Sequence, residues 1–174
     1  MNTTGTYWAQ YSYQFAHEFC HLVSNYEQQY DKANQWIDET LCEAASLFML
    51  RGMGVTWKDR PPYPSGQSFA KHLTAYADSR AATVESQVPD DEVWEEWLLR
   101  HEDGGRGNPY DREGNRIVAL RLLPLFEQYP EGWNAIRSLP ASQGRIGQYL
   151  TDWKNRAHPC DRPFITRIER ALGV

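Results

Sequence analysis

Residues 7–29 of the chain read YWAQYSYQFAHEFCHLVSNYEQQ, and this stretch decides the fold that the sequence predicts. It contains neither glycine nor proline, and its apolar residues recur at the spacing of one helical face. Those apolar residues are Trp8, Tyr11, Phe15, Phe19, Leu22, Val23 and Tyr26. The pattern predicts a single helix of about five or six turns.

A second helix is expected directly after a turn. Residues 31–34 are polar and turn-prone, and Asn34 is a suitable N-cap residue. The helix should run from Trp36 to about Arg51 and end at Gly52 and Gly54. A turn this short makes the first two helices antiparallel neighbours.

The rest of the chain is expected to form shorter helices joined by loops. Three prolines and a glycine predict a loop over 56–66, and clustered glycines predict a flexible segment over 104–114. Helices are expected over 68–87, 90–100, 115–129 (kinked or split at Pro124), 131–138, 142–155 and 162–172. No stretch alternates with period two, so we expect a mainly α chain with little or no β-sheet.

Composition favours a single globular domain and argues against nucleic-acid binding and membrane spans. The 174 residues, 41% of them hydrophobic, suit one domain over residues 1–174. The net charge is -5 without any long basic run, which argues against nucleic-acid binding. No run approaches the roughly 18 apolar residues of a membrane span. Three cysteines without CxxC spacing, and an N-terminus unlike a secretory signal, favour a cytoplasmic protein.

The motif that carries chemistry is His-Glu-Phe-Cys-His at residues 17–21. Residues at positions i and i+4 of a helix share a face, so His17 and His21 can reach one metal ion. Glu18 follows the first histidine directly and would lie beside the metal rather than on it. From there its carboxylate can take a proton from a zinc-activated water.

A third metal ligand is expected on the second helix. The metzincin pattern is rejected because Ser24 stands at its glycine position and Glu27 at its third histidine. Glu39 follows His21 after 17 intervening residues, which an antiparallel helix pair can bring back to the histidines. Asp38 or Glu43 could substitute for Glu39 as the ligand.

Glu43 lies one turn beyond Glu39 on the same helical face. A carboxylate in that position can accept the remaining ring N–H of a ligand histidine and so fix its tautomer. We therefore expect Glu43 to support the metal ligands rather than to bind the metal.

These residues resemble the gluzincin superfamily, which includes thermolysin-like proteases and zinc aminopeptidases. Residues 17–21 match HExxH, and Trp36-Ile37-Asp38-Glu39 is similar to the W-L-N-E stretch of the aminopeptidases. The resemblance covers about residues 8–50 and implies a zincin-like helix pair over 6–54, with 55–174 as a helical remainder. It implies Zn²⁺ bound by His17, His21 and Glu39, and hydrolysis of peptide or amide bonds.

The chain also departs from that family. Met1 lies 16 residues before His17, which leaves no room here for the upstream sheet that holds substrate in typical zincins. We also find no GxMEN-like substrate motif. The chain is therefore expected to be a fragment without its sheet, or a reduced domain that binds substrate in another way.

The donor that would stabilise a developing oxyanion is expected downstream of Glu39. His72, Tyr76 and Arg80 share one face of the third predicted helix, and Tyr76 is our candidate among them. Tyr63 and Tyr110 in the two loops are alternatives. Of the remaining groups, Cys20 and Cys42 are expected to be small buried residues, and His101 and His158 to be exposed beside loops.

The sequence thus predicts a zinc metallopeptidase with Glu18 as general base and a peptide or protein as substrate. Two alternatives remain. One is an interaction or regulatory domain that keeps the helix pair without catalysis, and the other is a zinc hydrolase acting on something other than peptides.

Overall fold

Every regular element among the described residues, 7–24 and 32–174, is helical in the computed structural model. The expectation of a mainly α chain is therefore confirmed. In chain order the elements are α1 (Trp8–Val23), η2 (Lys32–Asn34), α2 (Gln35–Asp59), η3 (Pro64–Phe69), α3 (Ala70–Glu85), α4 (Asp91–Gly107), α5 (Arg112–Gln128), η4 (Pro130–Ser138), α6 (Ile146–Arg156) and α7 (Arg162–Leu172).

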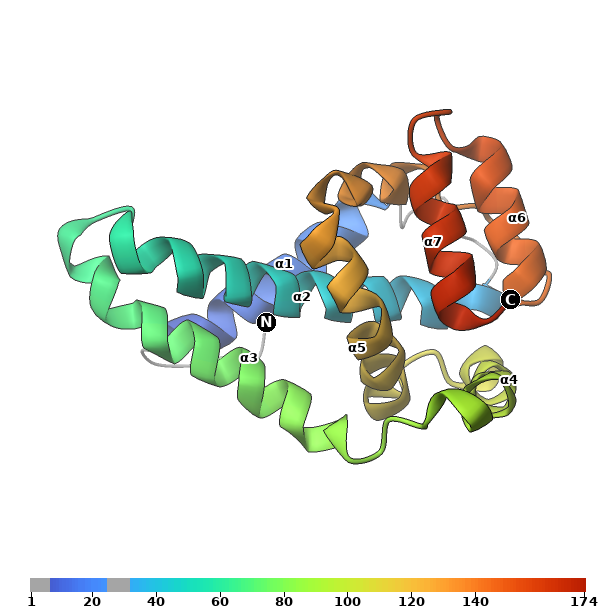
Figure 1. The fold of residues 1–174 in the computed structure, drawn as a ribbon, viewed down its shortest axis with the longest axis horizontal. Coiled ribbons are helices and arrows are strands. Elements are labelled where there is room, and N and C mark those ends of the chain that lie inside the picture. The colour runs from blue at the N-terminus through green and yellow to red at the C-terminus, as the bar shows by residue number, and fades with distance from the viewer. Residues whose placement is uncertain (1–6, 25–31) are drawn as a thin grey trace.

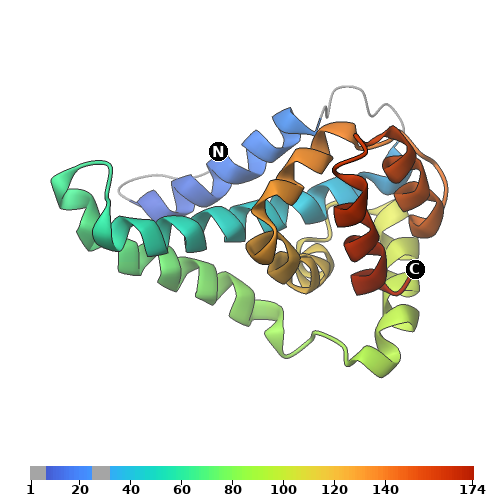
Figure 2. The same cartoon turned by 45° about the horizontal axis from the view of Figure 1, so that its top comes forward.

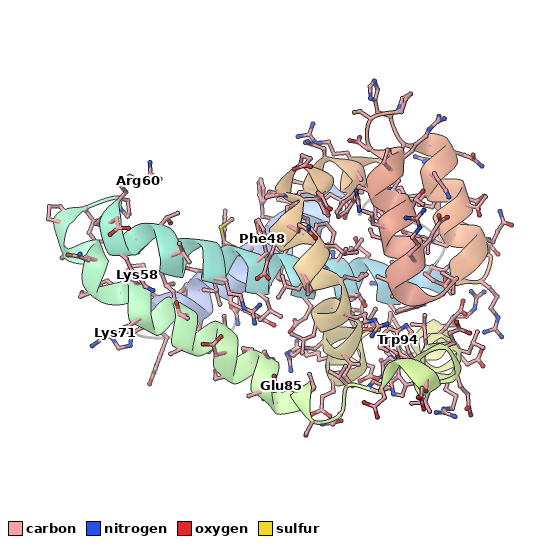
Figure 3. All side chains as sticks on the ribbon, in the orientation of Figure 1. Phe48, Lys58, Arg60, Lys71, Glu85 and Trp94 are labelled. Atoms are coloured by element: carbon pink, nitrogen blue, oxygen red, sulfur yellow. The ribbon has the colours of Figure 1, made fainter. Side chains whose placement is uncertain are left out.

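The long helix α2 is the centre of the fold. Helices α1, α3 and α5 all pack against it, while α6 and α7 lie together at the end of the molecule opposite the α2–α3 connection (Figure 1). In Figure 2, α1 runs along one side of α2 and α3 along another. The far end of α2 and the start of α3 project as an arm, with Lys58, Arg60 and Lys71 at its tip (Figure 3).

Helices α1 and α2 are antiparallel, as expected. Near the start of α1, the carbonyl oxygen of Tyr13 accepts a hydrogen bond from Ser46 Oγ at 2.9 Å. Near its end, His21 contacts Asp38. Residue numbers therefore rise along α1 as those of the opposing residues fall along α2. The predicted continuation of α1 beyond Ser24 and the turn over 25–31 lie outside the described residues.

The core consists of two apolar clusters separated along α2. The larger one gathers around Trp36, Leu41 and Trp94, each about 1% exposed. The smaller one lies where α1, α2, α3 and α5 meet, and includes Tyr13, Leu47 and Leu73. Burial of this apolar surface is the main force that holds the helices together. None of the helices in the described ranges is both long and apolar enough for a bilayer crossing.

The apolar stripe that predicts α1 is largely exposed. Trp8, Phe15, Phe19 and Leu22 are each at least half exposed, while Tyr13, Ala16 and Cys20 are the residues of α1 that face the core. The prediction of a helix was correct because periodicity reports an apolar face. It does not report what covers that face.

Glycines did not end helices where we expected. Helix α2 continues through Gly52 and Gly54 to Asp59. A Cβ atom at Gly54 would lie 2.2 Å from Thr74 Oγ1, so this glycine allows α3 to approach α2 closely. Likewise α4 continues to Gly107, through part of the segment predicted to be flexible. Helix α5 runs through Pro124 as one element rather than two.

Gly105 offers a test of this packing argument. A Cβ atom there would lie 2.8 Å from Cγ of Trp36, whereas one at Gly104, in the same helix, would meet nothing within 4 Å. Gly104→Ala should raise the free energy of unfolding by about 0.5–1 kcal/mol through helix propensity. Gly105→Ala should lower it by about 1–2 kcal/mol, because overpacking outweighs that gain. Urea denaturation measures both, and equal stabilisation by the two substitutions would contradict close packing on Trp36.

His101 is buried, contrary to our expectation, because α4 extends past it. Its ring stacks on Trp97, with centroids 5.1 Å apart, and meets Trp36 edge-on. Burial lowers the pKa of His101, although the charge of the neighbouring Asp111 opposes that shift. The fold therefore favours the neutral imidazole.

This burial predicts a specific acid sensitivity. The unfolded chain binds a proton at His101 more readily than the folded chain does. The contribution of neutral His101 to the free energy of unfolding is therefore complete above about pH 6.5, and it is lost as the pH falls through the lowered pKa. His101→Phe keeps an aromatic ring and should lose this part of the pH dependence. Thermal unfolding between pH 7.5 and 5 measures the difference from wild type, with exposed His158→Gln as the control. Parallel curves for wild type and His101→Phe would contradict the prediction.

Candidate metal centre

Helix α1 presents the two histidines of the motif side by side. Their ring centroids lie 4.9 Å apart, with the planes at 82°. The side chains of His17 and His21 are 23% and 12% exposed, so both lie at the edge of the core. The i and i+4 spacing on a regular helix produces this arrangement.

Glu39 of α2 completes a three-ligand group with the histidines. One carboxylate oxygen lies 3.2 Å from His17 Nε2, and the other lies 3.6 Å from His21 Nε2. One ligand atom from each residue falls within 4.8 Å of the other two. We call this group the outer triad. The structure thus brings together the three residues that the sequence named as ligands.

The donor set and its spacing fit zinc. At zinc–ligand distances of about 2.0–2.2 Å, two ligands of a tetrahedral ion lie about 3.4 Å apart. The observed contacts of Glu39 bracket that separation. Two imidazoles and one carboxylate also leave a fourth position for water or substrate, as catalytic zinc sites do.

Asp38 contacts His21 on the ring nitrogen that faces away from Glu39. Its carboxylate, fully buried, lies 2.7 Å from His21 Nδ1 through one oxygen and accepts a hydrogen bond from Ser24 Oγ at 2.8 Å through the other. Such a contact directs Nε2 of His21 toward the outer triad, because the proton is held on Nδ1. Burial lowers the pKa of His21, but the hydrogen bond to Asp38 and the charges of Asp38 and Glu39 raise it more, so the pKa is raised overall.

Two thiols lie beneath the same histidine. Cys42 Sγ is 3.3 Å from His21 Nδ1, and its thiol also contacts the thiol of Cys20. Both cysteines are buried, as expected. Burial, together with the neighbouring Cys20, raises the pKa of the Cys42 thiol well above its ordinary value.

Glu18 lies on the solvent side of α1, next to His17 and outside the outer triad. Its charge contributes to the raised pKa of His21, which places it near the histidines. Phe15 and Phe19, which flank it on the helix, stack on each other with ring centroids 5.8 Å apart. The motif glutamate is thus accessible and borders an exposed apolar surface.

Glu43 has a different partner from the one we expected. Its carboxylate accepts a hydrogen bond from Arg116 Nε of α5 at 2.5 Å, and both side chains are buried. The negative charge of Glu43 also helps to raise the pKa of the Tyr13 hydroxyl, although burial of that hydroxyl is the larger cause. The carboxylate that contacts the remaining ring nitrogen, Nδ1 of His21, is that of Asp38. Glu43 instead forms an ion pair with the buried guanidinium of Arg116 on α5. The spacing of residues along α2 cannot predict a partner on another helix.

The expected oxyanion donors are spread over the fold. Tyr76 packs edge-on against Tyr13, with ring centroids 5.7 Å apart. Tyr13 lies on α1, one helical turn before His17. Tyr110 accepts a hydrogen bond from Gln35, and Tyr63 contacts Trp57 in the projecting arm. The catalytic role of Tyr76 stays a prediction.

The supporting contact of Asp38 was missed by sequence reasoning, which considered this residue only as a substitute ligand. A signal was available, since Ser24 follows His21 at i+3 and can share the same acidic partner. Comparison of the chain with known protein families, curated proteins and solved structures found no significant match. The geometry alone therefore carries the functional argument.

A stability measurement can test whether Glu43 has a structural role, in its pair with Arg116, rather than a role in the candidate metal centre. Removing one partner of a buried ion pair typically costs about 3–5 kcal/mol, because the other charge is left unpaired. Glu43→Gln should therefore lower the free energy of unfolding by several kcal/mol, measured by urea denaturation. Glu127→Gln, which disturbs only the exposed contact with Arg51, is the control. A near-neutral effect of Glu43→Gln would contradict the structural role.

Proposed function

We propose that this protein is a zinc-dependent hydrolase of peptide or amide bonds. The observation that supports the proposal is the convergence of His17 Nε2, His21 Nε2 and the Glu39 carboxylate from two antiparallel helices. These three residues would hold the ion. When bound, zinc would polarise the scissile carbonyl and lower the pKa of water to around 7.

Glu18 is the general base in this proposal. It follows His17 directly on α1, and its exposed carboxylate can accept a proton from the attacking water. The same carboxyl group then donates the proton to the leaving amine as the peptide bond breaks. Asp38 keeps the Nδ1 proton of His21 in place, so that Nε2 is available as a ligand.

The surface around Glu18 favours a substrate with apolar side chains. Phe15, Phe19 and Leu22 are exposed on the same helix, within about one turn of the glutamate. A peptide lying along this surface would place apolar residues on them and its scissile bond near the outer triad. The proposed substrate is therefore a peptide or protein with large apolar residues beside the cleavage point.

A second candidate is an interaction domain in which the helix pair is structural. The observation that favours it is the exposed apolar face of α1, which includes Trp8, Phe15, Phe19 and Leu22. Exposed apolar patches of this kind often mark sites of protein–protein contact. In this case the chain would bind a partner and turn over no peptide.

Glu18→Gln distinguishes the two candidates. The substitution keeps the size of the side chain and removes the base, so zinc binding should be unchanged while kcat falls by about 10²–10⁴-fold. The substrate is selected from a peptide library with wild-type chain, with and without chelator, and zinc content is measured in the same samples. Glu85→Gln, an exposed glutamate at the distant end of α3, is the matched control and should retain full activity (Figure 3).

Two outcomes would contradict the proposed hydrolysis. Unchanged turnover by Glu18→Gln would remove Glu18 from the mechanism. A wild-type chain that holds one zinc and cleaves no library peptide would favour the interaction domain.

A further inference from the structure

His21 points its two ring nitrogens at two different sets of ligands. Nε2 faces Glu39, 3.6 Å away, within the outer triad. Nδ1 faces Asp38 at 2.7 Å and Cys42 Sγ at 3.3 Å. The ligand atoms of His21, Asp38 and Cys42 also lie within 4.8 Å of one another. We call this second group the inner site.

We propose that the inner site binds a thiophilic divalent cation such as Cd²⁺ through His21 Nδ1, the Asp38 carboxylate and Cys42 Sγ, and that it competes with the outer triad for His21. This inference goes beyond the proposed hydrolysis and stands on its own contacts. Its bearing on that function is regulatory, because an ion in the inner site would remove one ligand from the outer triad.

The donor chemistry favours a soft ion. A thiolate is the protein ligand that most strongly selects thiophilic metals, and imidazole suits the same ions. The outer triad, by contrast, offers no sulfur. Cys20 contacts the Cys42 thiol but is not part of the three-residue group. The two groups therefore differ in the kind of ion that they prefer.

Charge balance also permits an ion in this buried place. Asp38 and Cys42 are 0% exposed, and a lone charge there would be costly. On binding, Cys42 forms the metal–sulfur bond and releases its thiol proton to solvent. The carboxylate and the thiolate together then neutralise the two positive charges of the ion. His21, whose side chain is 12% exposed, links the site to the surface.

Simultaneous occupation of both groups is disfavoured by the chemistry of the imidazole. A neutral ring has one nitrogen that can bind a metal and one that carries a proton. When Nε2 binds in the outer triad, the proton on Nδ1 is held by Asp38. When Nδ1 binds in the inner site, the proton moves to Nε2 and can be donated to Glu39. Adjacent acids on α2 thus exchange the roles of ligand and proton acceptor.

The test is a cadmium titration of the reduced 174-residue chain, followed by ultraviolet absorption. Cadmium bound to a thiolate gives a sulfur-to-metal charge-transfer band. We expect one equivalent of cadmium per chain with this band, retained in His17→Ala and in Cys160→Ser, and lost in Cys42→Ser. Zinc bound beforehand should be released as cadmium fills the inner site.

Three results would overturn the proposal: no band in the folded wild-type chain, a band lost in Cys160→Ser, or a band unaffected by Cys42→Ser. If Cys42→Ser does not fold, as judged by circular dichroism, Cys160→Ser decides. The chain has three cysteines, so a band without Cys160 can arise only from Cys20 and Cys42. Because His17→Ala disrupts the outer triad alone, failure of zinc hydrolysis and failure of the inner site are separately visible.

Discussion

The buried carboxylate of Asp38 is the constraint on which the candidate metal centre depends. A charge with no exposure to water must be satisfied by neighbours, and here the neighbours are His21 and Ser24, both at the end of α1. Satisfying Asp38 therefore fixes the register of α1 against α2. With that register set, the next residue, Glu39, faces His17 and His21 without further adjustment.

Three acids within two turns of α2 have three different environments. Asp38 and Glu39 are adjacent, so they diverge by about 100° around the helix and contact opposite nitrogens of His21. Glu43, one turn after Glu39, turns toward α5 and pairs with Arg116. The three carboxylates therefore have three roles. Glu39 is a candidate metal ligand, Asp38 is a candidate acceptor of the His21 ring proton, and Glu43 belongs to a structural ion pair. The distinction arises from which helix each one faces.

Much of this arrangement could be predicted from local sequence. The period of apolar residues gave the first helix, and the HExxH spacing with a glutamate on the following helix gave the outer triad. The departures have a common physical origin in tertiary contacts. Gly54 was expected to end a helix and Gly105 to lie in a flexible segment. Both instead allow close helix packing, because Thr74 and Trp36 occupy the space where a Cβ would lie. His101 is buried for the same reason, since α4 continues past it. The partner of Glu43 lies on α5, 73 residues away, beyond the reach of local spacing.

The central claim is that α1 and α2 together form a nitrogen and oxygen site for zinc on the outer side of His21. X-ray absorption at the zinc edge, on the chain loaded with one equivalent of zinc, tests it most directly. The account predicts a first shell of nitrogen and oxygen at about 2.0–2.1 Å with the scattering pattern of two imidazoles. Failure of the chain to retain zinc, or a sulfur ligand at about 2.3 Å, would contradict it.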